Sequence, residues 1–155
     1  MKKILLSLAI FAVISGCSKN NDSQACQNVL PITEEPQIIS FCNTHSISYS
    51  KDTSGIFYQI IDIGSGMTPD LNAKISVTYK ATYLNDITLD EQTTPVVDFL
   101  RNFIEGWRIA IPLIRKGGHI KMVIPSSLCY GCLGYSNVVP PNAILFFELT
   151  LVDVQ

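Results

Sequence analysis

The stretch Phe103–Gly117, which reads FIEGWRIAIPLIRKG, decides how the rest of the chain is interpreted. Its large apolar side chains recur at the three- and four-residue spacing of a helix face, at Trp107, Ala110, Ile111 and Ile114. Pro112 lies inside this pattern and predicts a bend or an early end, because proline removes a backbone hydrogen bond and crowds the preceding turn. Gly117 follows two basic residues, an arrangement typical of a helix C-terminus. The stretch therefore predicts one short helix with a buried face.

The segments on either side of this helix have the pattern of strands. They are short runs of β-branched and aromatic residues divided by Gly, Pro, Asn and Asp, which is typical of a small antiparallel sheet. The candidate strands are Ile56–Ile63, Lys74–Leu84, Gly118–Ile124 and Ile144–Val154. Since a sheet and a helix that are each apolar on one side bury those sides against each other, we expect an α+β domain, with an antiparallel sheet wrapped around one short helix.

Composition and charge limit the classes of function. The chain has 155 residues, of which 47% are hydrophobic and 15% are charged. This is too apolar and too weakly charged for a disordered protein, and the length suits one domain. A formal net charge of -2 leaves no excess of basic side chains to contact a phosphate backbone. We therefore expect no nucleic-acid partner.

The N-terminus predicts export and lipid anchoring. Residues 1–16 combine two early lysines, an apolar run that is too short to span a membrane, and small residues directly before Cys17. This pattern resembles the signal peptide of bacterial lipoproteins, in which that cysteine carries the lipid; the alternative is an ordinary cleaved signal. We expect an anchor at Cys17 in the bacterial cell envelope, in the outer membrane on its periplasmic or surface face. After the signal peptide we expect a tether and N-terminal arm over residues 17–53, and then one domain over residues 54–155.

Short motifs in the second half of the chain have the order and spacing of a known family. They are Val77-Thr78-Tyr79, Leu89-Asp90, Ile104-Glu105-Gly106-Trp107, Tyr130-Gly131 and Pro140-Pro141-Asn142-Ala143. Together they resemble the FKBP-type peptidyl-prolyl cis-trans isomerases, over about Ser54 to Gln155. The resemblance implies a five- or six-stranded antiparallel sheet curled around a short helix, with an apolar pocket between them. It also implies an activity that accelerates X–Pro isomerisation without a metal or a cofactor.

The resemblance further implies the residues of the site. Asp90 would lie beside the twisting prolyl bond, while the backbone N–H of Ile104 and the hydroxyl of Tyr130 would donate hydrogen bonds to a peptide carbonyl. Trp107 would form the floor of the pocket. The walls would be Tyr79, Leu89, Val96, Phe103, Val138, Val139 and Phe147. Proline-containing peptides or unfolded envelope proteins would be the partners of this monomeric enzyme.

Two other interpretations stay open. Leu89 and Val96 stand where the family usually has phenylalanine, so the pocket loses aromatic contacts, and the chain could be a tethered peptide- or protein-binding module without turnover. The sequence Cys129-Tyr130-Gly131-Cys132 raises the third interpretation, a thiol oxidoreductase. The residues that follow it read as a loop, whereas redox enzymes place such a motif at a helix N-terminus, which lowers the thiol pKa.

The cysteines predict disulfides. With the lipidated cysteine set aside, four remain, and an even number in an exported protein predicts at least one bridge among three possible connectivities. Proximity in the sequence favours two pairs. A Cys129–Cys132 bridge would hold Tyr130 at the pocket mouth, and a Cys26–Cys42 bridge would staple the N-terminal arm.

Overall fold

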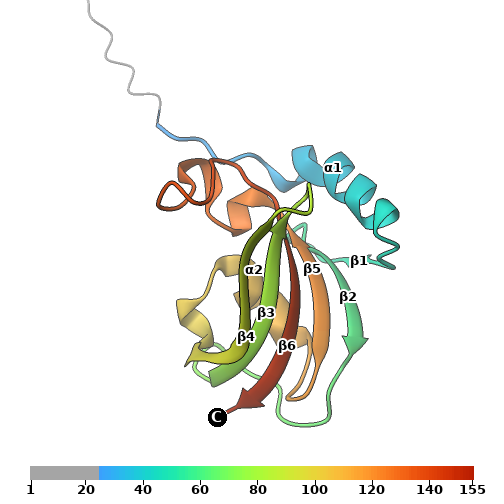
Figure 1. Ribbon diagram of the computed structural model, residues 1–155, viewed down its shortest axis with the longest axis vertical. Coiled ribbons are helices and arrows are strands. Elements are labelled where there is room, and N and C mark those ends of the chain that lie inside the picture. Colours follow the sequence, from blue (N-terminus) through green and yellow to red (C-terminus); the bar gives the residue numbers. More distant parts are fainter. Residues whose placement is uncertain (1–24) are drawn as a thin grey trace, which may run out of the picture.

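A six-stranded antiparallel sheet forms the centre of the computed structural model, which describes residues 25–155 (Figure 1). The strands follow the order β1-β2-β5-β6-β3-β4 across the sheet, and each neighbouring pair is antiparallel. Their bounds are β1 (Ser50–Lys51), β2 (Phe57–Asp62), β3 (Lys74–Tyr83), β4 (Thr88–Phe99), β5 (His119–Ile124) and β6 (Leu145–Val154). The expected α+β architecture, with such a sheet packed on a short helix, is confirmed.

Burial alternates along β6, which lies between β5 and β3 in the sheet. From Leu145 to Leu151 the buried residues are Leu145, Phe147, Leu149 and Leu151, and the residues between them are more exposed. Successive side chains of a strand point to opposite faces, so these four lie on one face of the sheet. They belong to the main core, which also contains the buried residues of the helix α2 (Glu105–Ala110).

The helix α2 ends early, as Pro112 predicts. The chain continues from it into a single 3-10 turn over Ile111–Leu113, with Pro112 inside that turn. Gly106 allows α2 to lie close to β5, because a Cβ at this position would collide with the side chain of Ile124. The helical face expected from the spacing is buried, at Trp107, Ala110, Ile111 and Ile114. The local prediction for this stretch is therefore confirmed.

The four expected strands are present to within one residue at each end, but the sequence does not predict β1 and β4. The strand β4 reads TLDEQTTPVVDF, which contains Pro95 and lacks a regular alternation. It lies at the edge of the sheet, where proline is tolerated. Its pairing with β3 jumps from Gln92 to Val96, so Pro95 lies in a bulge that needs no N–H for the ladder.

The N-terminal arm contains a helix that the sequence does not predict, α1 (Pro31–Thr44). Pro31 occupies the first helical turn, where its missing N–H is not needed, and the helix continues through Pro36. The side of α1 that faces the sheet contributes to a second core, whose buried residues are Ile38, Phe41, Cys42, Ile47, Phe57, Val123 and Ile144. Val123 alternates with residues of the main core along β5, so this second core lies on the opposite face of the sheet. Part of the stretch 17–53, which we expected to be a tether and an arm, is therefore a helix that packs on the sheet.

The predicted signal peptide and Cys17 lie outside the described residues, and both stay predictions. Within residues 25–155, no helix combines the length and the apolar character needed to cross a bilayer.

Candidate functional site

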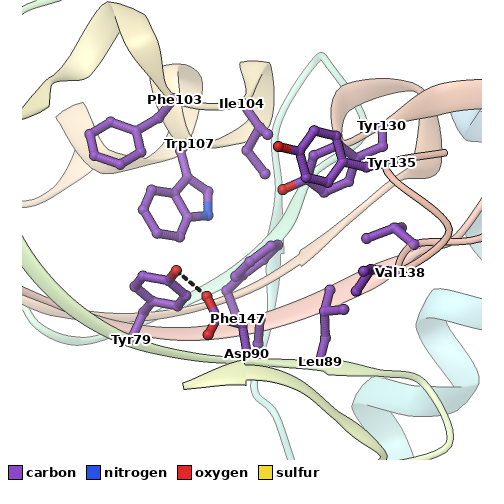
Figure 2. A pocket seen from close by; sticks show the side chains of 12 residues that line it. Tyr79, Leu89, Asp90, Phe103, Ile104, Trp107, Tyr130, Tyr135, Val138 and Phe147 are labelled. Carbon is purple, nitrogen blue, oxygen red and sulfur yellow. Dashed lines mark hydrogen bonds between the residues drawn. The ribbon is translucent and has the colours of Figure 1, made fainter. Parts of the chain in front are cut away.

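A cavity of about 280 Å³ lies between α2, the strands β3, β4 and β6, and the loop that joins β5 to β6 (Figure 2). This volume is at the small end of the range of roughly 300–1,000 Å³ for small-molecule pockets, so the cavity suits a group the size of one ring. Its lining residues are Tyr79, Ala81, Leu89, Asp90, Phe103, Ile104, Trp107, Tyr130, Tyr135, Val138, Val139 and Phe147.

Aromatic side chains form the floor of the cavity. Trp107 from α2 makes edge-to-face contacts with Tyr79 of β3 and Phe147 of β6, with ring centroids 4.9 Å and 5.4 Å apart. Phe103 stacks on the same indole at 5.1 Å. Such pairs hold each other's rings in place. The indole Nε1 is buried and has no hydrogen-bond partner among the described residues, so the floor excludes water even from its polar atom.

Asp90 is the acidic group of the wall, and two donors fix its carboxylate. The Tyr79 hydroxyl donates to Oδ2 at 2.5 Å, and the side-chain amide of Gln92 donates to Oδ1 at 3.0 Å. Burial, and then the hydrogen bond and charge of Asp90, raise the pKa of Tyr79 above its usual range, so this phenol stays protonated and continues to donate. The carboxylate of Asp90 is therefore held in one orientation at the pocket wall.

Two tyrosines of the β5–β6 loop form the opposite wall. The rings of Tyr130 and Tyr135 lie 5.2 Å apart, and Figure 2 shows both hydroxyls pointing toward Ile104. Within residues 25–155, the tyrosine hydroxyls that make hydrogen bonds are those of Tyr79 and Tyr83. The hydroxyls of Tyr130 and Tyr135 have no hydrogen-bond partner there. Burial, followed by the nearby Cys129, Tyr135 and Asp90, raises the pKa of Tyr130. Its hydroxyl is therefore a neutral donor that is free to bind a ligand.

The backbone of Ile104 provides a second free donor. Ile104 precedes the first residue of α2, and its carbonyl accepts the N–H groups of Trp107 and Arg108. N–H groups at the start of a helix have no partner within that helix, and the N–H of Ile104 makes no backbone hydrogen bond in the described part of the chain. The pocket thus offers two donors, from Ile104 and Tyr130, beside an aromatic floor.

All but one of the expected site residues line the cavity. The exception is Val96, which packs against the main core instead of forming a wall. The pairing of β4 shifts before Val96, and spacing in the sequence does not reveal such a shift. The sequence also missed Ala81 and Tyr135. Ala81 lies two residues after Tyr79 on the same strand, so its side chain points to the same face, and the alternation of a strand could have predicted it. Tyr135 lies in a loop, where no such alternation exists.

The disulfide differs from the expected pairing. Cys26 is bonded to Cys132, while Cys42 and Cys129 are free thiols, so the expected Cys129–Cys132 and Cys26–Cys42 bridges are both wrong. The physical reason is side-chain direction: α1 carries Cys42 into the second core, and the Sγ atom of Cys129 lies 3.8 Å from the carbonyl oxygen of Ile124. Burial raises the pKa of Cys42 to about 11 and also raises that of Cys129. Redox catalysis needs a lowered thiol pKa, so the oxidoreductase interpretation loses its support.

Comparisons with known proteins identify one family. The family model described as FKBP-type peptidyl-prolyl cis-trans isomerase matches residues 66–152. The chain is 36% identical to the FKBP-type isomerase FkpA of Escherichia coli strain K12 over 106 residues, which is 66% of this chain and 39% of FkpA. It is 29% identical to the peptidyl-prolyl cis-trans isomerase Mip of Coxiella burnetii over 105 residues, which is 66% of this chain and 46% of Mip. The chain therefore spans less than half the length of these curated relatives.

Solved structures agree with this result. The crystal structure of FkpA from Escherichia coli superposes with a TM-score of 0.72 and 29% sequence identity, over 81% of this chain and 61% of that chain. A peptidyl-prolyl cis-trans isomerase from Pseudomonas syringae pv. tomato superposes with a TM-score of 0.69 over 83% of this chain and 98% of that chain. Its sequence identity is 24%, so this second structure supports the fold alone.

Proposed function

Because the chain belongs to the FKBP-type peptidyl-prolyl cis-trans isomerases, we propose that its pocket accelerates cis–trans isomerisation of X–Pro bonds in other polypeptides. One observation carries this proposal: two donors without partners, the Ile104 N–H and the Tyr130 hydroxyl, lie beside a dry aromatic floor. The reaction makes and breaks no covalent bond, so the pocket needs no nucleophile. It needs only to bind the twisted amide better than the planar one.

The barrier to this rotation is roughly 18–20 kcal/mol, because resonance stabilises the planar amide. Twisting the C–N bond removes the resonance and makes the amide less polar. A floor that excludes water favours this less polar form, and donors placed for the twisted geometry add stabilisation that the planar form does not receive. Each 1.4 kcal/mol or so of differential stabilisation accelerates the reaction about tenfold, so a few weak contacts are enough.

Each residue of the pocket has a role in this scheme. The proline ring would lie on Trp107, and the Ile104 N–H and Tyr130 hydroxyl would bind the peptide carbonyls on either side of it. Asp90 would lie beside the twisting bond and place a negative charge there. Its bonds to Tyr79 and Gln92 keep that charge in place during the rotation.

The mouth of the pocket favours a second candidate function, a binding module without turnover. Val138 and Tyr135 are 59% and 57% exposed, and the wall residue Leu89 is aliphatic where the family usually has an aromatic ring. A proline ring therefore has fewer contacts at the mouth than at the floor. Such a pocket would bind a peptide loosely, and its rim would hold an apolar segment of an unfolded protein.

We also propose that the protein is lipid-anchored at Cys17 in the bacterial cell envelope, on the outer membrane, and acts there as a monomer on unfolded exported proteins. The pattern of residues 1–17 supports this location. The disulfide between Cys26 and Cys132 supports it independently, because disulfides persist in oxidising compartments outside the cytosol. Mass spectrometry of the membrane fraction from an expressing Gram-negative host should find lipid on Cys17, and the Cys17→Ser variant should be released. An unmodified Cys17 in the wild type would contradict the anchor.

The activity itself is tested with the chain from Ser18 onward and a set of X–Pro peptides. We expect acceleration of isomerisation by the wild type, about a tenfold loss in kcat/KM for Tyr130→Phe, which removes one hydrogen bond to the carbonyl, and a greater loss for Trp107→Leu. Circular dichroism checks that each variant is folded. Peptide binding by a folded wild type that does not accelerate isomerisation would favour the binding module.

A further inference from the structure

Three contacts join the N-terminal segment Cys26–Glu34 to the stretch Ser126–Cys132, which carries Tyr130. The segment lies outside the residues 66–152 that match the family. In Figure 1 the start of the described chain, in blue, runs past the orange loop between β5 and β6 before it enters α1. We propose that this segment is a positioning clamp, which fixes Tyr130 at the pocket wall and thereby sets the activity of the site. The inference rests on the proposed isomerase function.

Tyr130 needs such a clamp because the residue borders two cavities. It lines the main pocket and also a second, open cavity of about 420 Å³, whose other walls include Cys26 and Asn28. Close packing normally restricts a side chain to one rotamer, but Tyr130 is only half-buried, so packing restrains it less. Its neighbour Tyr135, whose ring is tilted against that of Tyr130, is 57% exposed and gives limited support. The backbone on either side of Tyr130 must therefore be held by other contacts.

The first contact anchors the beginning of the stretch. Glu34, in the first turn of α1, is 5% exposed. Its carboxylate accepts hydrogen bonds from the backbone N–H of Ser126 at 2.9 Å and from the hydroxyl of Ser126 at 2.5 Å. Ser126 is fully buried, and hydrogen bonds to a carboxylate are stronger than those between neutral groups. The backbone shortly before Tyr130 is thus tied to α1.

The other two contacts hold the end of the stretch. The side-chain oxygen of Asn28 accepts the backbone N–H of Cys132 at 2.9 Å. The same oxygen fills the place that a Cβ on Gly131 would occupy, and Gly131 has a φ of 57°, which glycine adopts without strain. The disulfide between Cys26 and Cys132 adds a covalent link with Cα atoms 5.7 Å apart. The two residues directly after Tyr130 are therefore held by the N-terminal segment.

The clamp acts on catalysis through the position of one hydroxyl. A displacement of about 1 Å in a positioned group is enough to lower a rate substantially, so a loose Tyr130 stabilises the twisted amide less well. One contact can be opened reversibly, because Cys26 is exposed and a dithiol reductant can reach its sulfur. The reductant gives two electrons and two protons to the sulfur pair of Cys26 and Cys132, which becomes two thiols, and is itself oxidised to a disulfide.

The test measures kcat/KM on X–Pro peptides for the chain from Ser18, with and without reductant. We expect reduction, the Cys26→Ser/Cys132→Ser double variant and Asn28→Ala each to lower kcat/KM by roughly three- to tenfold, the effect of weakening one hydrogen bond. The double variant should not respond to reductant. Gln27→Ala is the matched control, because Gln27 is the exposed neighbour of Asn28, and it should behave as the wild type. Unchanged kcat/KM after reduction and in Asn28→Ala would overturn the proposal.

The Tyr130→Phe background distinguishes positioning from a general structural effect. If the clamp acts through the hydroxyl of Tyr130, then opening it in a chain that lacks this hydroxyl has no further effect on kcat/KM. Losses of the same size in both backgrounds would show that the segment supports the fold and does not position Tyr130.

Hydrogen exchange of residues 127–133 separates failure of the clamp from failure of the isomerase. A folded wild type without activity would refute the proposed function, and the clamp would then be judged by exchange alone. Faster exchange of this stretch after reduction and in Asn28→Ala supports the clamp. Exchange that stays unchanged in both cases overturns it.

Discussion

Replacing Glu34 by alanine is expected to lower the free energy of unfolding by about 3–6 kcal/mol. The carboxylate accepts two hydrogen bonds from Ser126, and hydrogen bonds to charged groups contribute roughly 1.5–3 kcal/mol each. The variant leaves the N–H and the hydroxyl of Ser126 buried without this acceptor. Since single domains have about 5–15 kcal/mol of stability, a loss of this size should move the unfolding midpoint to a clearly lower urea concentration.

The neighbouring Glu35 provides the matched control. It carries the same side chain on the same helix, but its partner is Lys51 at 2.7 Å in a partly exposed ion pair. Such pairs contribute about 0–1 kcal/mol, so Glu35→Ala should cause only a small loss. Urea unfolding can be followed by the fluorescence of Trp107, the one tryptophan in the chain, with an unchanged m-value as the sign of a simple stability change. Equal losses for the two variants would refute the argument that Glu34 docks α1 onto the pocket loop.

Three further predictions concern the pocket wall, the buried phenol and the thiols. Leu89→Phe is expected to lower KM about two- to tenfold, because an added aromatic contact to the proline is worth roughly 0.5–1.5 kcal/mol. A titration of the initial rate with peptide measures KM. An unchanged KM would mean that this wall does not contact the substrate. Stability is expected to begin to fall near pH 9, where Cys42 and Cys129 ionise in the unfolded chain and keep their protons in the folded state. It should fall further above about pH 10, because the tyrosines of the unfolded chain ionise there while Tyr79, whose pKa is raised, keeps its proton in the folded state. Urea unfolding from pH 8 to 11 should show a weaker fall in Tyr79→Phe, and identical slopes would contradict this assignment. Finally, Cys42 and Cys129 should be unreactive to thiol reagents in the folded, unreduced chain from Ser18, because burial raises both thiol pKa values. Both should react after unfolding. A Cys129–Cys132 bridge found by peptide mapping would contradict the observed pairing.

Periodic patterns made the central part of the fold predictable from the sequence. The spacing of Trp107, Ala110 and Ile114 predicts the buried face of α2, and Pro112 predicts its early end. The four strands that alternate or are rich in β-branched residues were found for the same reason, because burial of one face imposes a period on the side chains. Most pocket residues followed from the family resemblance, whose motifs lie on α2, β3 and β4 and in the β5–β6 loop.

The rest of the structure depends on contacts between distant segments, which a local pattern does not encode. Within α1, the apolar contact with the sheet is limited to the buried Ile38, Phe41 and Cys42 and the partly buried Ile39. Pro36 inside α1 also argues against a helix when the sequence is read alone. The disulfide joins residues 106 positions apart, because the N-terminal segment returns to the pocket loop only in the folded state. Val96 was predicted to line the pocket and does not, because a bulge in β4 changes the register before it. The spacing of residues in the sequence does not reveal such a bulge.

Exchange spectroscopy of the cis and trans signals of an X–Pro peptide tests the isomerase proposal most directly. Without a catalyst the two forms interconvert over tens to hundreds of seconds. With a small fraction of the oxidised chain, we expect exchange between the two signals at a rate proportional to the protein concentration, and the folded Trp107→Leu variant should lose this effect. Peptide signals that shift on binding while exchange stays at the uncatalysed rate would contradict the isomerase proposal, because the pocket would then bind proline without accelerating its isomerisation.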